Sequence, residues 1–289
     1  MLSEMIAGII IFIAIFIIIT ITGEEFFTFK MREQVRYLFL IIFYAPLPRT
    51  ITTLKRSPLL SLYLPWAIGE HTDPVSSVHV RHTGRFRYGN KGRWMNVDGE
   101  AFFSLAVPGF VWHTRIAYLP GIWIDTFDYY VHRKAGMLFN LFSFVPLNNA
   151  FGNEIKPASL FRYLANAPLF PMVFGTDNSI VWESVDESTA RVVIHDTDLS
   201  ADALVHFDGS GRIRSIESFR RSDQETGKPV PGHFVDTFSE YSNVQGYKIP
   251  MRITSELILP DGEHASTDVT ITSIEYEKAG KKVWGGESS

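Results

Sequence analysis

The sequence predicts an α+β protein in which an N-terminal transmembrane helix precedes a curved, mainly antiparallel β-sheet, a half-barrel packed on a few helices. Three observations carry this prediction. Residues 5–23 form an apolar run without a charge. Beyond this run, apolar residues mostly recur with the period of two that is typical of strands. Turns such as Asp208-Gly-Ser-Gly211 join neighbouring segments locally, and strands joined in this way are antiparallel.

The apolar run is long enough to cross a membrane. At about 1.5 Å per residue, a helix over 5–23 spans roughly 28 Å, close to the thickness of the hydrocarbon core. A cleaved secretory signal is the alternative, but the segment lacks a basic start and Gly23-Glu24-Glu25 is a poor cleavage site. We therefore expect an uncleaved anchor, in a bacterial inner membrane.

The side of the membrane that the rest of the chain occupies stays open. Lys30, Arg32 and Arg36 follow the anchor, and the positive-inside rule places them in the cytoplasm. A second apolar run at 37–48 is too short to span and ends in two prolines, so we expect a re-entrant or interfacial helix there. If this run crossed the membrane, the orientation would be inverted.

The chain divides into three parts. Residues 1–57 hold the anchor, the interfacial segment and a basic connector, 58–276 form one β-rich domain, and 277–289 form a charged, Gly/Ser-rich flexible tail. Within the domain, helices are expected at 58–68 and 157–166, each with Pro at its start. The strands are expected at 78–88, 191–195, 203–207, 212–220, 248–259 and 267–276.

Composition excludes several classes of function. A net charge of −4 weighs against nucleic-acid binding. The absence of cysteine excludes disulfides, thiolate catalysis and Cys-based metal sites. No motif of a metalloprotease, a serine hydrolase or a P-loop is present. We expect no cofactor and no metal.

Two pairs of polar residues could in principle form a metal site or an acid–base site, but their spacing argues against it. His79 and His82 are three residues apart, as are Asp125 and Asp128, so on strands the members of each pair face opposite sides of the sheet. A basic cluster is a candidate site for a phosphate or a lipid headgroup, with a solvated strand face as the alternative; it comprises Arg81, Arg85, Arg87, Lys91 and Arg93.

An ordered set of short motifs resembles a large bacterial family of uncharacterised proteins. The motifs are Gly92-Arg-Trp94, Ala101-Phe-Phe103, Pro108-Gly-Phe-Val-Trp112, Asp125, Arg162-Tyr-Leu-Ala165, Phe170-Pro171, Trp182, Thr189-Ala190, Phe207-Asp208, Gly211, Gly246 and Ile249-Pro250. The resemblance covers about residues 65–276. Members of the family usually have Glu after the Arg-Tyr-Leu-Ala motif, where this chain has Asn166. The resemblance implies a fold similar to lipoprotein-carrier (LolA-like) domains, in which a curved sheet surrounds an apolar hollow; it implies no activity.

The residues favour the same arrangement independently, because a curved sheet around a helix has a concave apolar face. A pocket there needs aromatic walls and a few polar groups. Core packing is the alternative for each aromatic residue, since burying one stabilises a fold by about 1.5–3 kcal/mol. The candidate ligand-binding residues are Trp94, Phe110, Trp112, Trp123, Asp125, Phe127, Arg162, Tyr163 and Trp182.

The predicted function is therefore that of a membrane-anchored, non-enzymatic binding module for a membrane lipid or another apolar small molecule. Two alternatives stay open. One is a membrane assembly protein that binds a protein partner through 35–48. The other is an enzyme in which Asp125, Arg162 and a histidine such as His113 meet as an acid–base site.

Overall fold

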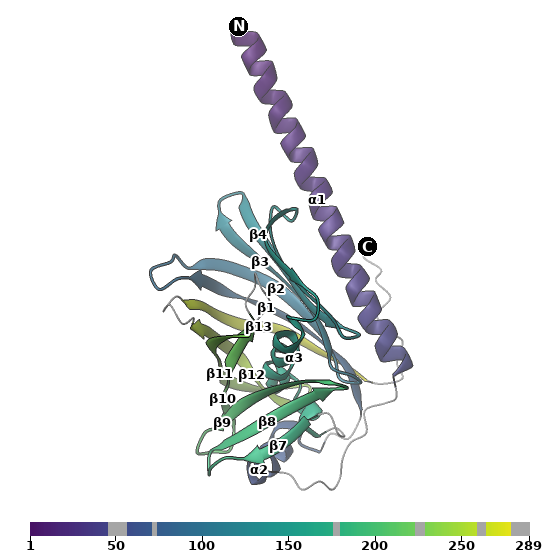
Figure 1. Ribbon diagram of the computed structural model, residues 1–289, viewed down its shortest axis with the longest axis vertical. Coiled ribbons are helices and arrows are strands. Elements are labelled where there is room, and N and C mark those ends of the chain that lie inside the picture. Colours follow the sequence, from purple (N-terminus) through teal and green to yellow (C-terminus); the bar gives the residue numbers. More distant parts are fainter. Residues whose placement is uncertain (46–56, 71–73, 176–179, 223–228, 259–263, 279–289) are drawn as a thin grey trace.

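The domain is built around one 13-stranded sheet (Figure 1). The computed structural model describes residues 1–45, 57–70, 74–175, 180–222, 229–258 and 264–278. The strands are β1 (Val75–Tyr88), β2 (Met95–Ser104), β3 (Gly109–Leu119), β4 (Ile122–Val131), β5 (Lys134–Leu141), β6 (Val145–Phe151), β7 (Ile180–Ser184), β8 (Thr189–Asp196), β9 (Leu199–Phe207), β10 (Ile213–Ser222), β11 (Pro229–Val244), β12 (Tyr247–Ile258) and β13 (His264–Lys278).

Two meanders make up the sheet. Strands β1 to β6 follow one another, strands β7 to β13 do the same, and β13 returns to pair with β1. All strand pairs in the described residues are antiparallel. A register shift between Arg81 and His82 breaks the β1–β13 ladder, and such irregularities bend a sheet. The predicted α+β class with a large antiparallel sheet is confirmed.

Short helices fill most of the concave face. Helix α2 (Pro58–Ile68) and helix α3 (Lys156–Ala165) both begin with proline in the first turn, and two 3-10 turns follow α3 at 167–169 and 171–175. Leu160, Tyr163 and Leu164 of α3 are buried in the main core. The Tyr163 hydroxyl donates to the backbone oxygen of Ser104 at 2.8 Å, which fixes α3 against the sheet.

Helix α1 (Leu2–Tyr44) is a single continuous helix of 43 residues. Its N-terminal half extends beyond the sheet (Figure 1). An 18-residue window in it has a mean hydropathy of 3.0, and none of that window is buried. By length and composition, α1 can therefore cross a membrane.

The C-terminal half of α1 packs on the outer face of the sheet. Phe27, Val35, Leu38, Phe39 and Ile42 form a second apolar cluster with residues of β2 to β5. The prediction of a separate re-entrant or interfacial helix at 37–48 is wrong for 37–44, which is the end of α1. Its apolar side chains cover the chain's own sheet, so the buried ones are not available to a protein partner.

Two predicted segments lie largely outside the described residues. The basic connector falls mainly on 46–56, and the flexible tail mainly on 279–289. At its described end, the domain continues through Lys278, which pairs with Val75.

Truncating the docking face of α1 should separate it from the sheet. Leu38 is 1% exposed and contacts Gly109, whereas Leu40, two residues further, is 52% exposed. We expect Leu38→Ala to weaken docking by about 2 kcal/mol or more, because a buried leucine is lost, and Leu40→Ala to have little effect. Hydrogen exchange of β2 to β5 measures the difference; equal protection in both variants would contradict this packing.

A candidate ligand-binding cavity on the inner face of the sheet

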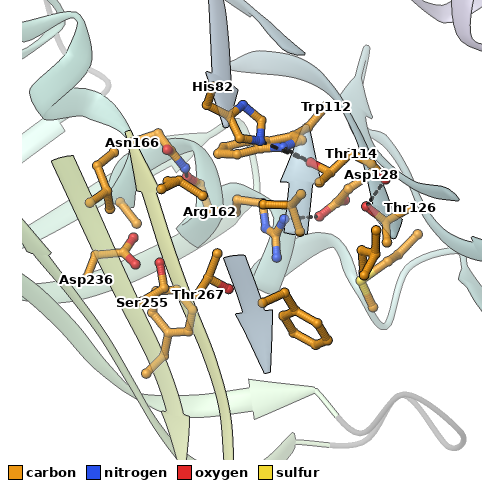
Figure 2. A pocket seen from close by; sticks show the side chains of 18 of the residues that line it. His82, Trp112, Thr114, Thr126, Asp128, Arg162, Asn166, Asp236, Ser255 and Thr267 are labelled. Atoms are coloured by element: carbon orange, nitrogen blue, oxygen red, sulfur yellow. Dashed lines mark hydrogen bonds and ion pairs between the residues drawn. The ribbon is translucent and has the colours of Figure 1, made fainter. Parts of the chain in front are cut away.

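A cavity of about 180 Å³ lies between the inner face of the sheet and the C-terminal end of α3. Strands β1 to β5 and β11 to β13 contribute its walls. The apolar wall consists of Phe86, Val97, Trp112, Ile116, Met137, Phe139, Ala165, Phe234, Ile253 and Val269. The polar lining consists of His82, Thr114, Thr126, Asp128, Arg162, Asn166, Asp236, Ser255 and Thr267 (Figure 2).

The size of the cavity limits its occupant. An apolar cavity of about 150 Å³ is large enough to bind benzene, while sites for drug-sized ligands are about 300–1,000 Å³. The rest of the concave face is filled by the protein's own aromatic and aliphatic side chains. The cavity as it stands therefore accommodates a ring or a short alkyl segment, and not a whole diacyl lipid.

One ion pair crosses the cavity. Arg162 of α3 lies over the ring of Trp112 and donates through Nη1 to Asp128 Oδ2 at 3.0 Å. Asp128 is buried. Burial raises the pKa of Asp128, and the nearby Arg162 offsets part of this effect. The pair places a fixed cation and its counter-ion beside apolar walls.

Asp236 of β11 is a second buried carboxylate, and one of its oxygens has no partner. The residue is 3% exposed, and Oδ1 accepts no hydrogen bond from any described residue. Burial raises the pKa of Asp236 to about 7, although a hydrogen bond from Ser255 and the charge of Arg162 act in the opposite direction. Asp236 and Asp128 lie on opposite sides of Arg162 in Figure 2. An unsatisfied buried acceptor is rare. A hydrogen-bond donor of a ligand in the cavity could therefore bind to Asp236 Oδ1.

His82 supplies a neutral polar group at the same cavity. Its Nε2 lies 3.2 Å from Thr114 Oγ1, which also accepts from Trp112 Nε1 at 2.8 Å. Burial, with a smaller effect of His113, lowers the pKa of His82 to about 4. The imidazole is therefore uncharged at neutral pH. No group of three or more potential metal ligands occurs among the residues that the structure describes.

The structure places two of the nine candidate residues, Trp112 and Arg162, at this cavity. Phe110 and Tyr163 are fully enclosed in the main core, and Trp182 packs against it. Trp94 lies under the guanidinium groups of Arg85 and Arg87, from the predicted basic cluster. Trp123, Asp125 and Phe127 belong to the outer side, toward α1.

Asp125 and Asp128 do face opposite sides of β4, as their spacing predicts. Asp125 accepts from His113 Nε2 and Arg115 Nε, both at 2.9 Å, on the side where Arg115 Nη2 also donates to Glu24 of α1 at 2.9 Å. Arg162 pairs with Asp128 on the other side. The hypothetical acid–base site of Asp125, Arg162 and His113 is therefore not assembled, although His113 and Asp125 are paired.

Sequence reasoning did not select His82, Asp128 or Asp236 as ligand-binding residues, but a signal for them exists. Phe234, Asp236 and Phe238 alternate along one strand, so the carboxylate shares a face with two phenylalanines. His82 likewise follows the buried Val78 and Val80 on the same face of β1. A polar residue on an otherwise apolar strand face marks either a satisfied core group or a site.

These features define a domain made of one curved antiparallel sheet with a small amphipathic cavity, attached to a long apolar helix. The chain belongs to the family of unknown function DUF6920, whose model matches residues 58–276. The resemblance to an uncharacterised family is thus confirmed. No curated protein matches the chain.

The chain is similar to several solved structures. A LolA-superfamily protein from Nitrosomonas europaea is 12% identical, with 77% of this chain and 94% of that chain covered and a TM-score of 0.40. A DUF1329 protein from Desulfovibrio piger is 9% identical, with 78% and 93% covered and a TM-score of 0.39. A putative outer membrane lipoprotein-sorting protein domain from Vibrio parahaemolyticus is 9% identical, with 72% and 87% covered and a TM-score of 0.34.

Proposed function

We propose that this protein is a membrane-anchored binding module whose cavity takes a small amphiphilic molecule, or the polar end of a larger one. The observation that carries the proposal is the buried Asp236 Oδ1, an acceptor that no described residue satisfies, at a cavity with apolar walls. The apolar walls favour a ring or a short alkyl segment. Asp236 favours a ligand that donates a hydrogen bond, and most of all a cationic one.

Helix α1 supports the anchored state. Its first half exposes large apolar side chains on all sides. Burying each of them away from water would be favourable by about 1.5–3 kcal/mol. A lipid environment provides this burial. Its second half is packed on the sheet, so the anchor and the domain are connected by one uninterrupted helix.

Filling the cavity should abolish binding of a small probe. Thr267 lines the cavity on β13, whereas Thr270 of the same strand is exposed on the other face. In lipid nanodiscs, we expect n-hexylamine to raise the melting temperature of the wild type and of Thr270→Phe, but not of Thr267→Phe. A ligand at one hundred times its Kd stabilises the folded state by about 2.7 kcal/mol. Equal stabilisation of all three proteins would indicate an effect on the lipid and contradict binding in the cavity.

A further inference from the structure

Two hairpin turns of the domain lie beside the membrane-spanning half of α1. Tyr118 and Leu119 are the last two residues of β3, next to the β3–β4 turn, and the β5–β6 turn carries Phe142 and Phe144. We call these four residues the hairpin tips. Trp123, at the start of β4, connects the two turns, because its ring lies 5.3 Å from that of Phe142 and its backbone oxygen accepts from the Phe142 amide.

The β5–β6 turn contacts α1 inside the apolar run. The ring of Phe142 meets that of Phe16 edge-on, with centroids 5.2 Å apart. Phe144 packs so closely on Gly23 that a Cβ added to the glycine would lie 2.7 Å from Phe144 Cβ. The turn therefore follows α1 for about two helical turns, from Gly23 towards Phe16.

A charged layer lies next to these contacts, further along α1. Arg115 donates to Glu24 of α1 at 2.9 Å and lies over the ring of Trp123. Phe16 precedes Glu24 by eight positions, which in an α-helix is about 12 Å along the axis. From the charged end of α1 towards its N-terminus, the order is thus the ion pair at Glu24, then the aromatic contacts at Gly23 and Phe16, then the remaining exposed apolar residues. This order is similar to that at a membrane–water interface, where tryptophan and tyrosine side chains such as those of Trp123 and Tyr118 are enriched at the headgroup level.

From this order we infer that the hairpin tips enter the lipid bilayer beside α1, so that the domain contacts the membrane through the turns as well as through its anchor. The inference rests on the anchored state of α1 proposed above. Tyr118 is 45% and Leu119 44% exposed, at a hairpin end that would otherwise expose apolar side chains to water. Arg93 donates to the backbone oxygen of Tyr118 from the domain side, which places a cation next to the tip, where lipid phosphates would lie.

Single-cysteine labelling tests the depth of the tips, because the chain has no native cysteine. Leu119→Cys and Phe142→Cys would each carry an environment-sensitive NBD label in phosphatidylcholine vesicles containing doxyl-labelled lipid. Ile13→Cys in α1 is the reference for a membrane-spanning position. Ser210→Cys, in the exposed β9–β10 turn at the end of the domain near α2, is the reference for water.

We expect the Leu119 label to show a blue-shifted emission and to be strongly quenched by lipids with the doxyl group near the headgroup. The Ser210 label should show neither effect. The Phe142→Cys variant removes the ring that contacts Phe16 and Trp123, so Leu119 gives the decisive reading if that variant misfolds. A Leu119 label that behaves like Ser210, while the Ile13 label is quenched by lipids with the doxyl group deep in the acyl chain, would overturn the inference and leave the anchor intact. If the Ile13 label were also unquenched, the anchored state itself would be contradicted.

Discussion

Replacing Asp125 with alanine is expected to destabilise the folded domain by about 3–5 kcal/mol, the typical effect of removing one partner of a buried ion pair. Its side chain is completely buried and accepts from His113, Arg115, Trp123 and Ser143. The substitution leaves these donors without their acceptor. Arg115 also loses the carboxylate that orients its guanidinium group towards Glu24. We therefore expect chemical denaturation to show a large loss of stability together with detachment of α1 from β3 and β4.

The pH dependence of stability provides an independent check on Asp125. Burial alone would raise the pKa of this carboxyl group, but the hydrogen bonds from His113, Arg115 and Ser143 outweigh it and lower the pKa to about 2. A lowered folded-state pKa stabilises the protein above the unfolded value of 3.8 and loses that contribution as the pH falls towards 2. Asp125→Ala should lack this acid-dependent loss. Asp98→Ala, on the exposed surface of β2, is the control; if both variants matched the wild type, the role of Asp125 would be contradicted.

Replacing Asp236 with asparagine is expected to stabilise the domain at alkaline pH relative to acidic pH. A carboxyl group with a folded-state pKa of about 7, against 3.8 when exposed, favours folding while it is protonated and opposes it as the pH rises. The stability of the variant relative to the wild type should therefore increase by about 3–4 kcal/mol between a pH of about 4 and a pH of about 8. Guanidinium denaturation at the two pH values measures this change.

Asp236→Asn should weaken the binding of a cationic ligand, although it stabilises the fold at alkaline pH. The wild type is expected to bind n-hexylamine more tightly than n-hexanol, because a buried carboxylate forms a charge-assisted hydrogen bond with an ammonium group. Asp236→Asn should remove this preference for the amine but still bind n-hexanol. A residue that destabilises the fold and improves binding is typical of functional sites. An unchanged preference for the amine would show that Asp236 does not contact the ligand.

The fold was predictable where local signals agree with the tertiary structure. The Asp208-Gly-Ser-Gly211 turn joins β9 to β10 as its glycines predict, and α2 has the bounds that Pro58 and the following apolar residues indicate. The long β11 was not predicted, since its apolar alternation is interrupted by Asp236, the residue that reaches the cavity. At the site, the aromatic content predicted that Trp112 lines a pocket. Asp128, Arg162 and Asp236 come together only because α3 packs between β4 and β11 in the folded domain.

Tertiary packing also determines where the second apolar run lies. Residues 37–44 have the composition of an interfacial segment, and nothing local distinguishes a helix that lies on lipid from one that lies on a sheet. The partner surface is made by Phe102, Val111, Phe127 and Leu138, which face outward from four different strands. Such a surface exists only after the meander has formed, so sequence periodicity cannot reveal it.

Native mass spectrometry of the full chain, extracted from its own membranes into nanodiscs, tests the proposed function most directly. We expect the wild type and Thr270→Phe to retain a small bound molecule that carries a hydrogen-bond donor, and Thr267→Phe to have lost it. A wild-type mass that equals the bare chain, with no probe amine able to bind and no difference among the three proteins, would contradict a ligand-binding role for the cavity.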